Sequence, residues 1–386
     1  MCKFFCTFAP NFVNMKICFE QESVKKACEW MSQAQHIVIL THMAPDGDAM
    51  GSALALWHFL STEHRIQNTD LISPSSVSEA VGTLSAKRSI TVIVPNAFPA
   101  FFNWMPGADK ILVYETQQKA CEPLLAEADL FVCTDFNDPK RIGPVGEKML
   151  QRDCPKILFD HHLNPVPFAD VLFSFPEASS ASEIVYSFLK NTDRSADRIQ
   201  NTDLATCIYT GLMTDTGNFS FNSTNAELYD IIADLLRAGV QKDAIYDAVF
   251  NQYSTDRVRL TGYALYRKMR IYPEHHLALI TLSADELDQY HYQPGDTEGL
   301  VNMPLQIAEV YYSVFMREER AKPGTPRSRI RLSFRSQGDR PVNGWAAEVF
   351  NGGGHMNASG GELFGSLQQA VRLFEQSFPK YVKVES

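Results

Sequence analysis

One loop of the sequence combines an imidazole group with two carboxylates. Within the stretch THMAPDGDAMGS these groups occupy three of seven consecutive positions: His42, Asp46 and Asp48. The apolar run 36–40 before the stretch predicts a buried parallel strand, and the run 53–60 after it has helical composition. Open α/β sheets bind ligands at the carboxyl ends of strands, and imidazole with carboxylates suits first-row divalent metals. The loop is therefore a candidate metal site, with a solvated polar turn as the alternative.

Three further segments end in side chains of the same types. They are Asp135 after the apolar run 129–134, Asp160, His161 and His162 after the apolar run 156–159, and Asp215 after the helical segment 203–213. Neighbouring parallel strands bring their carboxyl ends together, so we expect these groups to converge on the first loop. Burying several carboxylates together is unfavourable unless cations compensate them, as a pair of divalent ions would. The alternatives are a helix cap for Asp135 and a turn residue for Asp215.

The composition is typical of an ordinary soluble globular protein, with 45% hydrophobic and 21% charged residues. A length of 386 residues predicts two domains. The net charge of −10 argues against a protein that coats duplex DNA. No apolar run reaches the roughly 18 residues of a membrane span, and residues 1–20 lack the pattern of a signal peptide. Because the eight cysteines are scattered without CxxC spacing, we expect free thiols in a cytoplasmic protein.

Strands alternate with helices over residues 24–240, which predicts an α/β domain with a doubly wound parallel sheet. The expected strands are 36–40, 91–94, 111–114, 129–134 and 156–159, and the expected helices are 22–34, 52–65, 180–190, 203–213 and 225–238. We interpret residues 1–23 as an N-terminal extension and the polar segment 67–89 as an inserted loop. A helical linker, 241–270, then precedes a smaller α/β domain, 271–386, and we expect a cleft between the two domains.

The second domain carries a basic segment. Its expected strands are 276–282, 311–315 and 329–334, followed by a helix at 344–350. Residues 317–340 hold eight Lys and Arg against three Asp and Glu, a local charge of +5 (8 − 3) on an acidic chain. The arginines of the third strand, Arg329, Arg331 and Arg335, alternate and therefore share one face. This face suits phosphate binding, with a solvated strand surface as the alternative.

A glycine run follows the last expected helix. The residues Gly352, Gly353 and Gly354 allow the backbone to approach a ligand closely, with N–H groups that can bind phosphate oxygens. An ordinary helix C-cap followed by a loop is the alternative. The candidate substrate contacts after the run are His355, Asn357 and Ser359. In the first domain, the candidate phosphate contacts near the expected cleft are Arg141, Ser180 and Ser182.

Five of these motifs, in this order, resemble the DHH phosphoesterases. They are HxxxDGD, the Asp after the next apolar strand, Asp160-His161-His162, GLMTDTG, and the glycine run with His355, which resembles the signature of the DHH-associated C-terminal domain. The resemblance covers roughly residues 24–386 and is greatest to bacterial nanoRNases (oligoribonucleases) that are also pAp phosphatases. The insertion 67–89 and the N-terminal extension depart from the compact family pattern.

The resemblance implies a role for each residue of the first domain. The implied ligands are His42 and Asp46 for one ion, Asp48, His161 and Asp215 for the other, and Asp135 as a bridge between the two. His162 would face the substrate phosphate, and Asp160 would support the histidine pair. Two ions would activate a water molecule for attack, so no covalent protein nucleophile is required. The mixed ligands favour Mn²⁺.

We therefore expect a Mn²⁺-dependent phosphodiesterase that hydrolyses short RNA, from di- to tetranucleotides such as pApA, to mononucleotides, and that also accepts pAp. Three alternatives stay open at this point. They are a phosphodiesterase for signalling dinucleotides such as cyclic di-AMP, a pyrophosphatase or exopolyphosphatase, and a non-catalytic nucleotide sensor. The sequence also leaves open whether the chain forms a homodimer.

Overall fold

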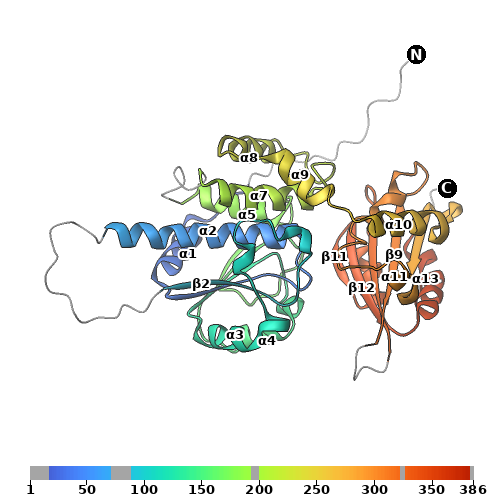
Figure 1. Ribbon diagram of the computed structural model, residues 1–386, viewed down its shortest axis with the longest axis horizontal. Helices are drawn as coiled ribbons and strands as arrows, with labels where there is room; N and C mark the ends of the chain where they lie inside the picture. Colours follow the sequence, from blue (N-terminus) through green and yellow to red (C-terminus); the bar gives the residue numbers. More distant parts are fainter. Residues whose placement is uncertain (1–16, 71–87, 193–199, 322–326, 383–386) are drawn as a thin grey trace, which may run out of the picture. The chain divides into compact units, whose positions relative to one another are not determined.

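The computed structural model describes residues 17–70, 88–192, 200–321 and 327–382 (Figure 1). The chain divides into two compact units, Met1–Asn251 and Gln252–Ser386. Each unit contains a six-stranded sheet that carries helices, so the predicted α/β class with two domains is confirmed. The cleft expected between the domains stays a prediction.

The division between the units falls inside the expected linker 241–270. Helix α9 (Lys242–Phe250) is the last helix of unit 1, and α10 (Thr255–Tyr263) is the first helix of unit 2. None of the helices that the structure describes has the length and hydropathy needed to cross a membrane.

All neighbouring strands of the unit 1 sheet are parallel, in the order β3-β2-β1-β4-β5-β6. The strands are β1 (His36–Leu40), β2 (Ser89–Val94), β3 (Leu112–Val113), β4 (Leu130–Thr134), β5 (Lys156–Asp160) and β6 (Val171–Ser174). The central strands β1, β4 and β5 are continuous apolar runs because both faces of a parallel sheet are covered. The chain goes from β1 to one edge of the sheet and then returns to the other side of β1. In open α/β sheets ligands bind at the carboxyl ends of the strands beside such a reversal, which here lies between β1 and β4.

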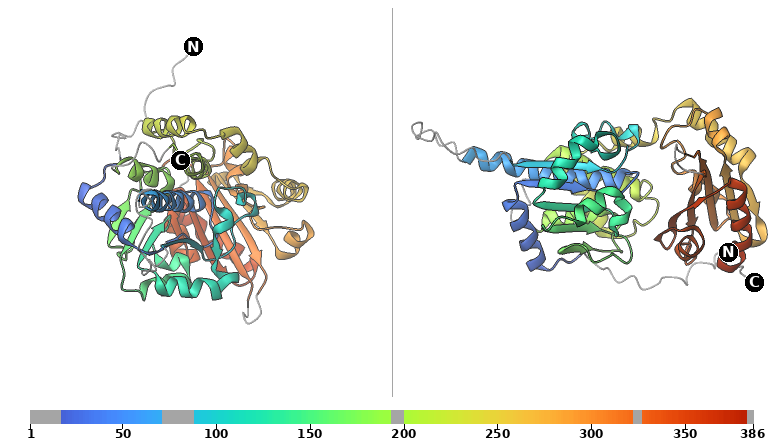
Figure 2. Two further views of the ribbon diagram at one scale, coloured as in Figure 1. Left: turned by 60° about the vertical axis from the view of Figure 1, so that its left-hand side comes forward. Right: turned by 90° about the horizontal axis from the view of Figure 1, so that it is seen from below.

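Helices cover both faces of this sheet, which is therefore doubly wound as predicted (Figure 1; Figure 2). One face carries α1 (Gln21–Gln33), α2 (Gly47–Asp70), α5 (Ala181–Lys190), α7 (Thr202–Asp215) and α8 (Ala226–Arg237), and the other carries α3 (Tyr114–Glu127) and α4 (Pro144–Leu150). Successive residues of a strand point to opposite faces. In β1, Ile37 and Ile39 accordingly belong to the core under the first group of helices, and Val38 and Leu40 to the core under the second.

Several predicted boundaries were wrong. Helix α2 continues to Asp70 instead of ending at residue 65, because no Gly or Pro interrupts residues 52–70. The first residues of the expected insertion 67–89 are therefore helical, and residues 71–87 lie outside the described part of the chain. Tyr114 begins α3 instead of ending a strand, and Asp215 is the last residue of α7. The edge strand β6 was missed because its run of four residues is short.

Unit 2 has a mixed sheet in the order β11-β12-β10-β9-β8-β7, in which only β8 and β9 are parallel among the described pairs. The strands are β7 (Arg270–Tyr272), β8 (Leu277–Leu282), β9 (Tyr312–Glu319), β10 (Arg329–Ser336), β11 (Gly353–His355) and β12 (Ala358–Phe364). Helices α12 (Asn343–Phe350) and α13 (Leu367–Tyr381) pack against one face around Trp345 and Phe374. Helix α10 and the short α11 (Ala284–Gln289) pack against the other face.

Gly353 and Gly354 of the glycine run in unit 2 belong to an edge strand, and not to the loop of the alternative interpretation. Asn351 ends α12 in the left-handed conformation, with φ of 48°. The chain then forms β11, in which Gly353 pairs with Gly360 and His355 pairs with Ala358 of β12. Cross-strand hydrogen bonding in this hairpin therefore fixes the backbone of the run.

Candidate metal centre

The loop after β1 aims His42 at two carboxylates. The Nδ1 atom of His42 donates a hydrogen bond to the main-chain oxygen of Met43 (3.0 Å), so Nε2 carries the lone pair. This Nε2 atom lies 3.2 Å from Oδ2 of Asp135 and 3.6 Å from Oδ2 of Asp46. A lone pair repels two carboxylates that face it. The group therefore requires a cation, either a proton or a metal ion.

Asp46 is held in place by the start of α2. Its Oδ1 atom accepts hydrogen bonds from the main-chain N–H groups of Asp48 (3.1 Å) and Ala49 (3.0 Å). This contact caps the helix, which explains why the helix begins at Gly47. Capping uses one oxygen and leaves Oδ2 facing His42.

Asp48 is buried where α2, α5 and α7 meet. Its carboxylate accepts hydrogen bonds from the N–H groups of Ala181 (2.6 Å) and Ser182 (2.9 Å) in the first turn of α5, a position that favours negative charge. Gly211 of α7 allows this approach, because a Cβ atom there would lie 2.0 Å from the Ser182 hydroxyl and 2.8 Å from Oδ1 of Asp48. Three helices thus fix one carboxylate.

Asp135 stands between two histidines. It follows β4 with φ of 63°, a left-handed conformation that costs a residue with a side chain about 1–2 kcal/mol. Its main-chain N–H still bonds to Phe159 of β5 (2.9 Å), which extends the strand pairing by one residue. The turn directs Oδ2 to Nε2 of His42 (3.2 Å) and Oδ1 to Nε2 of His161 (3.4 Å). The helix-cap alternative is not observed, because Asp138 caps the helical turn that follows.

His161 completes a second group. Its Nε2 atom lies 3.6 Å from Oδ2 of Asp215 and 3.9 Å from Oδ2 of Asp48. Two of the sets of candidate ligand atoms in the described residues consist of predicted ligands alone, and within each set all atoms lie within 4.8 Å of one another: His42, Asp46 and Asp135, and Asp48, Asp135 and His161. Asp135 belongs to both sets. The structure therefore brings together all six residues that the sequence predicted as metal ligands.

The charges in this cluster depend on one another. Burial lowers the pKa of His42, but Asp46 and Asp135 outweigh burial and raise this pKa to about 10. Burial also lowers the pKa of His161, yet the surrounding carboxylates raise it well above its usual value. Burial and the nearby charge of Asp135 raise the pKa of Asp48. Protons thus supply positive charge that a divalent cation can replace, and this donor set fits such a cation.

A family model described as "DHH family, N-terminal domain" matches residues 36–212. The chain is also 41% identical in sequence to an exopolyphosphatase-related protein from Bacteroides fragilis, whose crystal structure is known. That match covers 95% of this chain and 98% of the other, with a TM-score of 0.80. The chain belongs to the DHH family of phosphoesterases.

Relatives of this DHH protein extend over most of its length. It is 26% identical over 341 residues to the bifunctional oligoribonuclease and PAP phosphatase of Bacillus subtilis. This match covers 87% of this chain and 92% of the relative. It is 26% identical over 340 residues to the protein of the same description from Thermus thermophilus, covering 86% of each. Together with the buried His and Asp clusters, these matches make the chain a DHH-family metal-dependent phosphoesterase.

Two residues of the Asp160-His161-His162 motif form a hydrogen-bonded chain with Arg141. They are Asp160 and His162. Nδ1 of His162 donates to Oδ1 of Asp160 (2.8 Å). Nη1 of Arg141 lies 2.7 Å from Nε2 of His162, and because a guanidinium can only donate, Nε2 must accept. Burial and the charge of Arg141 lower the pKa of His162 despite its contact with Asp160. His162 is therefore neutral, and the positive charge at this end of the site belongs to Arg141.

The contact between Arg141 and His162 had no clear signal in the sequence. Arg141 lies in the helical turn Pro139–Ile142, and its main-chain oxygen accepts a hydrogen bond from Met43 (2.9 Å), which ties this turn to the loop that carries His42. Ser180 caps α5, with its hydroxyl accepting the N–H of Glu183 (3.1 Å).

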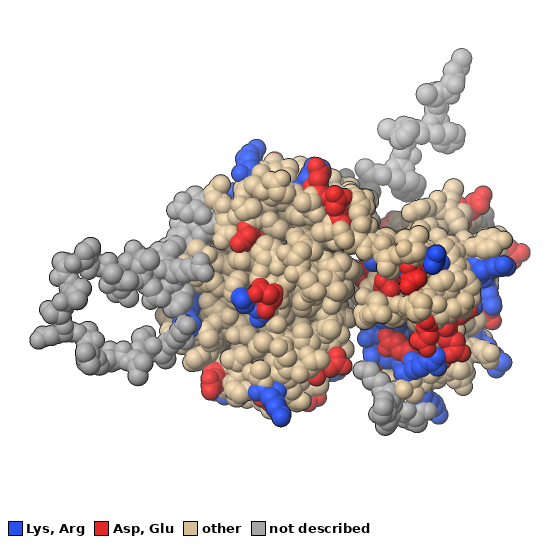
Figure 3. Space-filling view, in the orientation of Figure 1, with Lys and Arg blue, Asp and Glu red and all other residues tan. Residues whose placement is uncertain are grey.

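The arginines of unit 2 share the half-exposed face of β10, as predicted, but carboxylates accompany them. Glu319 lies 2.9 Å from Arg317 and 3.3 Å from Arg331, and Glu362 of β12 pairs with Arg329 (2.7 Å). Acidic and basic atoms likewise alternate over the face of unit 2 seen in Figure 3. The local charge of +5 was counted over residues 317–340 and so did not include Glu362, which lies on the neighbouring strand β12 and pairs with Arg329.

The other predicted residues of unit 2 take part in local hydrogen bonds. Arg335 donates to the main-chain oxygen of Phe334 (2.9 Å). Asn357 donates to the Ser336 hydroxyl (3.0 Å), and Ser359 donates to the main-chain oxygen of His355 (2.9 Å). Their predicted contacts with substrate stay predictions.

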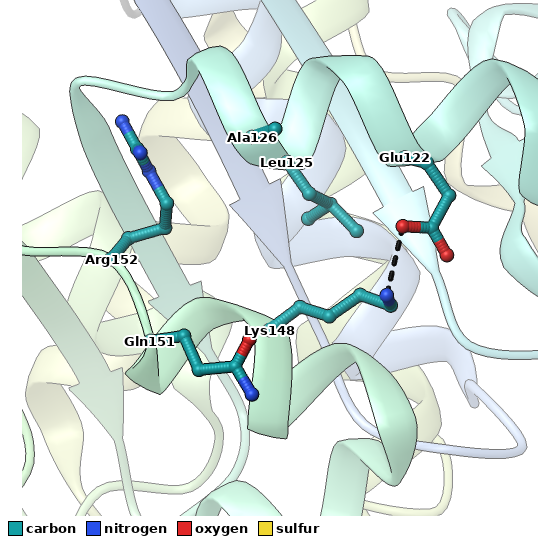
Figure 4. Close-up of a pocket in the computed structure, with 6 residues that line it drawn as sticks. All are labelled: Glu122, Leu125, Ala126, Lys148, Gln151 and Arg152. Carbon is teal, nitrogen blue, oxygen red and sulfur yellow. Dashed lines mark hydrogen bonds and ion pairs between the residues drawn. The ribbon is translucent and has the colours of Figure 1, made fainter.

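A surface pocket of about 260 Å³ lies between α3 and α4 of unit 1. Figure 4 shows Lys148 of α4 reaching across it to Glu122 of α3, at 2.8 Å. The lining contains no residue of the metal cluster.

Proposed function

We propose that the chain is a Mn²⁺-dependent phosphodiesterase that hydrolyses di- to tetraribonucleotides such as pApA to mononucleotides, with pAp as a second substrate. The observation that carries the proposal is the placement of Asp135, whose two oxygens face two separate groups of ligand atoms. Relatives described as oligoribonucleases and PAP phosphatases, matched over most of the chain, support the choice of substrate.

In this proposal the two groups of ligand atoms each hold one divalent ion. The ligands are His42 and Asp46 for one ion, Asp48, His161 and Asp215 for the other, and Asp135 for both. A pair of such ions lowers the pKa of water and stabilises charge on phosphoryl oxygens. Imidazole mixed with carboxylates favours Mn²⁺ over ions that prefer oxygen ligands alone.

The chain's own residues orient the substrate phosphate. Nε2 of His162 accepts from Arg141 and so has no proton to give to an anion. The remaining N–H groups of Arg141 are therefore the donors for a phosphate oxygen, and His162 holds the guanidinium in position. Asp160 is fully buried and fixes the His162 ring through Nδ1. In this proposal Arg141 contacts the phosphate and His162 supports it, whereas the family resemblance implied that His162 itself faces the phosphate.

A second candidate is hydrolysis of pyrophosphate or polyphosphate. It is favoured by the 41% identity to a structure described as exopolyphosphatase-related. Both candidates require the same metal cluster, so only a comparison of activity on different substrates distinguishes them.

The test is a comparison of substrates. Purified protein with Mn²⁺ is assayed side by side on pApA, longer RNA, pAp, cyclic di-AMP, pyrophosphate and polyphosphate. We expect the highest kcat/KM on pApA, activity on pAp, and no turnover after chelation. A higher kcat/KM on pyrophosphate or polyphosphate would assign the second candidate. Preference for cyclic di-AMP over its linear form would assign a signalling phosphodiesterase.

A further inference from the structure

Exposed apolar side chains adjoin the metal cluster of unit 1 in the sequence. Met43 directly follows His42, and Leu163 directly follows His162, and each side chain is 37% exposed. Phe221 follows Asp215 by six positions and is 51% exposed. Single exposed apolar residues are ordinary on protein surfaces. These three, however, follow polar site residues on three different connections. An inorganic phosphate chain has no apolar surface that they could contact.

The backbone after α7 is shaped so that Phe221 faces outward. Gly217, Asn218 and Phe219 are all left-handed, with φ of 55°, 55° and 62°. This conformation is strained for a residue with a side chain such as Phe219, so contacts elsewhere must offset the strain. Phe219 supplies one such contact, because its ring packs edge-to-face on Tyr209 at 5.8 Å between ring centroids. One aromatic ring of the loop thus anchors it to the core while the next lies at the surface.

Hydrogen bonds of the loop fix the backbone at Phe221 before any ligand arrives. Its own main-chain N–H bonds to the oxygen of Thr216 (3.2 Å), and the N–H of Ser220 bonds to the same oxygen (2.9 Å). The Ser223 hydroxyl donates to the oxygen of Phe219 (2.9 Å). The ring also lies against Gly217, where a Cβ atom would be 2.2 Å from Cε1 of Phe221. Binding of a ligand to this ring therefore loses little entropy by ordering the loop that carries it.

We propose that Phe221 is a stacking platform for a nucleobase and that it makes unit 1 select nucleoside phosphates over inorganic phosphate chains. This inference rests on the proposed function and assigns base selection to the metal-binding unit itself. An aromatic side chain stacks on any base, so Phe221 would favour nucleotides without distinguishing their sequence.

The experiment compares pApA with a doubly abasic analogue that keeps both riboses and the phosphodiester. Three variants are measured: Phe221→Ala, Phe221→Leu, which keeps apolar packing on Gly217 but loses the ring face, and Phe221→Tyr, which keeps the ring. We expect Phe221→Ala to raise the KM for pApA by about 5- to 100-fold, the range of one lost base stack, and to change the KM for the abasic analogue by about twofold at most. Phe221→Leu should resemble Phe221→Ala, and Phe221→Tyr should resemble the wild type.

Tyr229→Ala is the matched control. Tyr229 is an aromatic side chain of similar exposure (48%) on α8, a helix that carries no residue of the cluster. This control should leave both KM values unchanged. The inference is overturned if Phe221→Ala raises the KM for both substrates equally, or for neither, while Tm and Mn²⁺ affinity stay at wild-type values.

A binding measurement separates this inference from the proposed reaction. Calorimetry with Mn²⁺ compares AMP with ribose 5-phosphate on the wild type and on Phe221→Ala. If the wild type does not cleave pApA, the proposed function is wrong. The stacking platform would still be supported if Phe221→Ala binds AMP more weakly than the wild type does and binds ribose 5-phosphate equally well. Equal binding of AMP by the two proteins would overturn the platform whatever the reaction proves to be.

Discussion

The metal cluster of unit 1 lies at the carboxyl edge of its sheet, and the arginines of unit 2 share one face of β10. Both regions concentrate charged side chains, but their charges are balanced differently. In unit 1, Asp48 and Asp135 are buried. Asp48 accepts hydrogen bonds from main-chain N–H groups of α5, and Asp135 faces two imidazoles, which are cationic only when protonated. In unit 2, Arg331 and Arg329 are half-exposed and lie beside permanent counter-charges, Glu319 and Glu362.

The difference indicates what each region can bind. In unit 1 the positive charge beside the carboxylates is carried by protons on His42 and His161, which a divalent cation can displace, so the cluster is organised for metal. Exposed or half-exposed ion pairs contribute little stability, typically 0–1 kcal/mol, so a phosphate can displace the carboxylates of unit 2 at small cost. Removing an acid should therefore abolish function in unit 1 and improve anion binding in unit 2.

The largest effect is expected at Asp135. The Asp135→Asn change removes the negative charge that both groups of ligand atoms share, so kcat should fall by about 10³-fold or more and the Mn²⁺ bound per chain should decrease. Steady-state kinetics and metal analysis measure the two effects. Asp109→Asn is the control, because Asp109 is exposed and pairs with Lys110, away from the cluster residues. Full activity of Asp135→Asn would remove the basis of the metal assignment.

A smaller loss is expected at Asp160. The Asp160→Asn change should release the His162 ring and, through it, Arg141, and so lower kcat about 10- to 100-fold, as the loss of a supporting partner does at metal sites. Mn²⁺ affinity should stay near that of the wild type, because neither His162 nor Arg141 is a proposed ligand. Titration with Mn²⁺ alongside kinetics tests this. A parallel loss of Mn²⁺ affinity would show instead that Asp160 supports the ligands.

The apparent affinity for Mn²⁺ should depend on pH. His42 has a pKa raised to about 10 in the metal-free protein, so it holds a proton at neutral pH that the metal must displace. The pKa of His161 is raised as well. Because protons compete with metal, the Kd for Mn²⁺ should rise as pH falls below about 10, by about tenfold per pH unit for each proton displaced. Calorimetry between pH 6 and 9 measures the slope, and a Kd independent of pH would contradict the cluster geometry.

The smallest effect is expected in unit 2 and has the opposite sign. Glu319→Gln should leave Arg317 and Arg331 without their shared carboxylate and lower the KM for pApA about two- to fivefold, since such pairs are worth up to about 1 kcal/mol. Glu348→Gln, which removes the partner of Lys380 in the same unit, is the control. An increase in KM would show that Glu319 itself contributes to binding.

The sequence predicted the cluster well because one physical rule connects its parts. Apolar runs before His42, Asp135 and His161 indicated buried parallel strands, and parallel strands end at the same edge. Predicting that these three residues converge required no knowledge of side-chain packing. The DHH resemblance added roles to residues that the strand pattern had already grouped.

What the sequence could not show depends on packing and register. The contact between Arg141 and His162 joins a helical turn to a strand end, and no local pattern encodes it. Glu362 faces Arg331 only through the pairing of β10 with β12, which a count of charges along one segment cannot detect. The outward placement of Phe221 depends on three left-handed residues, of which glycine alone gives a recognisable signal.

Asp48 has a consequence for the order in which the protein is assembled. Main-chain N–H groups of α5 already compensate its charge, so the junction of three helices does not depend on an ion to hold it together. A newly synthesised chain can therefore fold first and be loaded with metal afterwards, unlike small metal-binding domains that remain unfolded until the ion arrives. Scarcity of the ion would then leave a pool of intact, silent protein that becomes active as soon as supply returns.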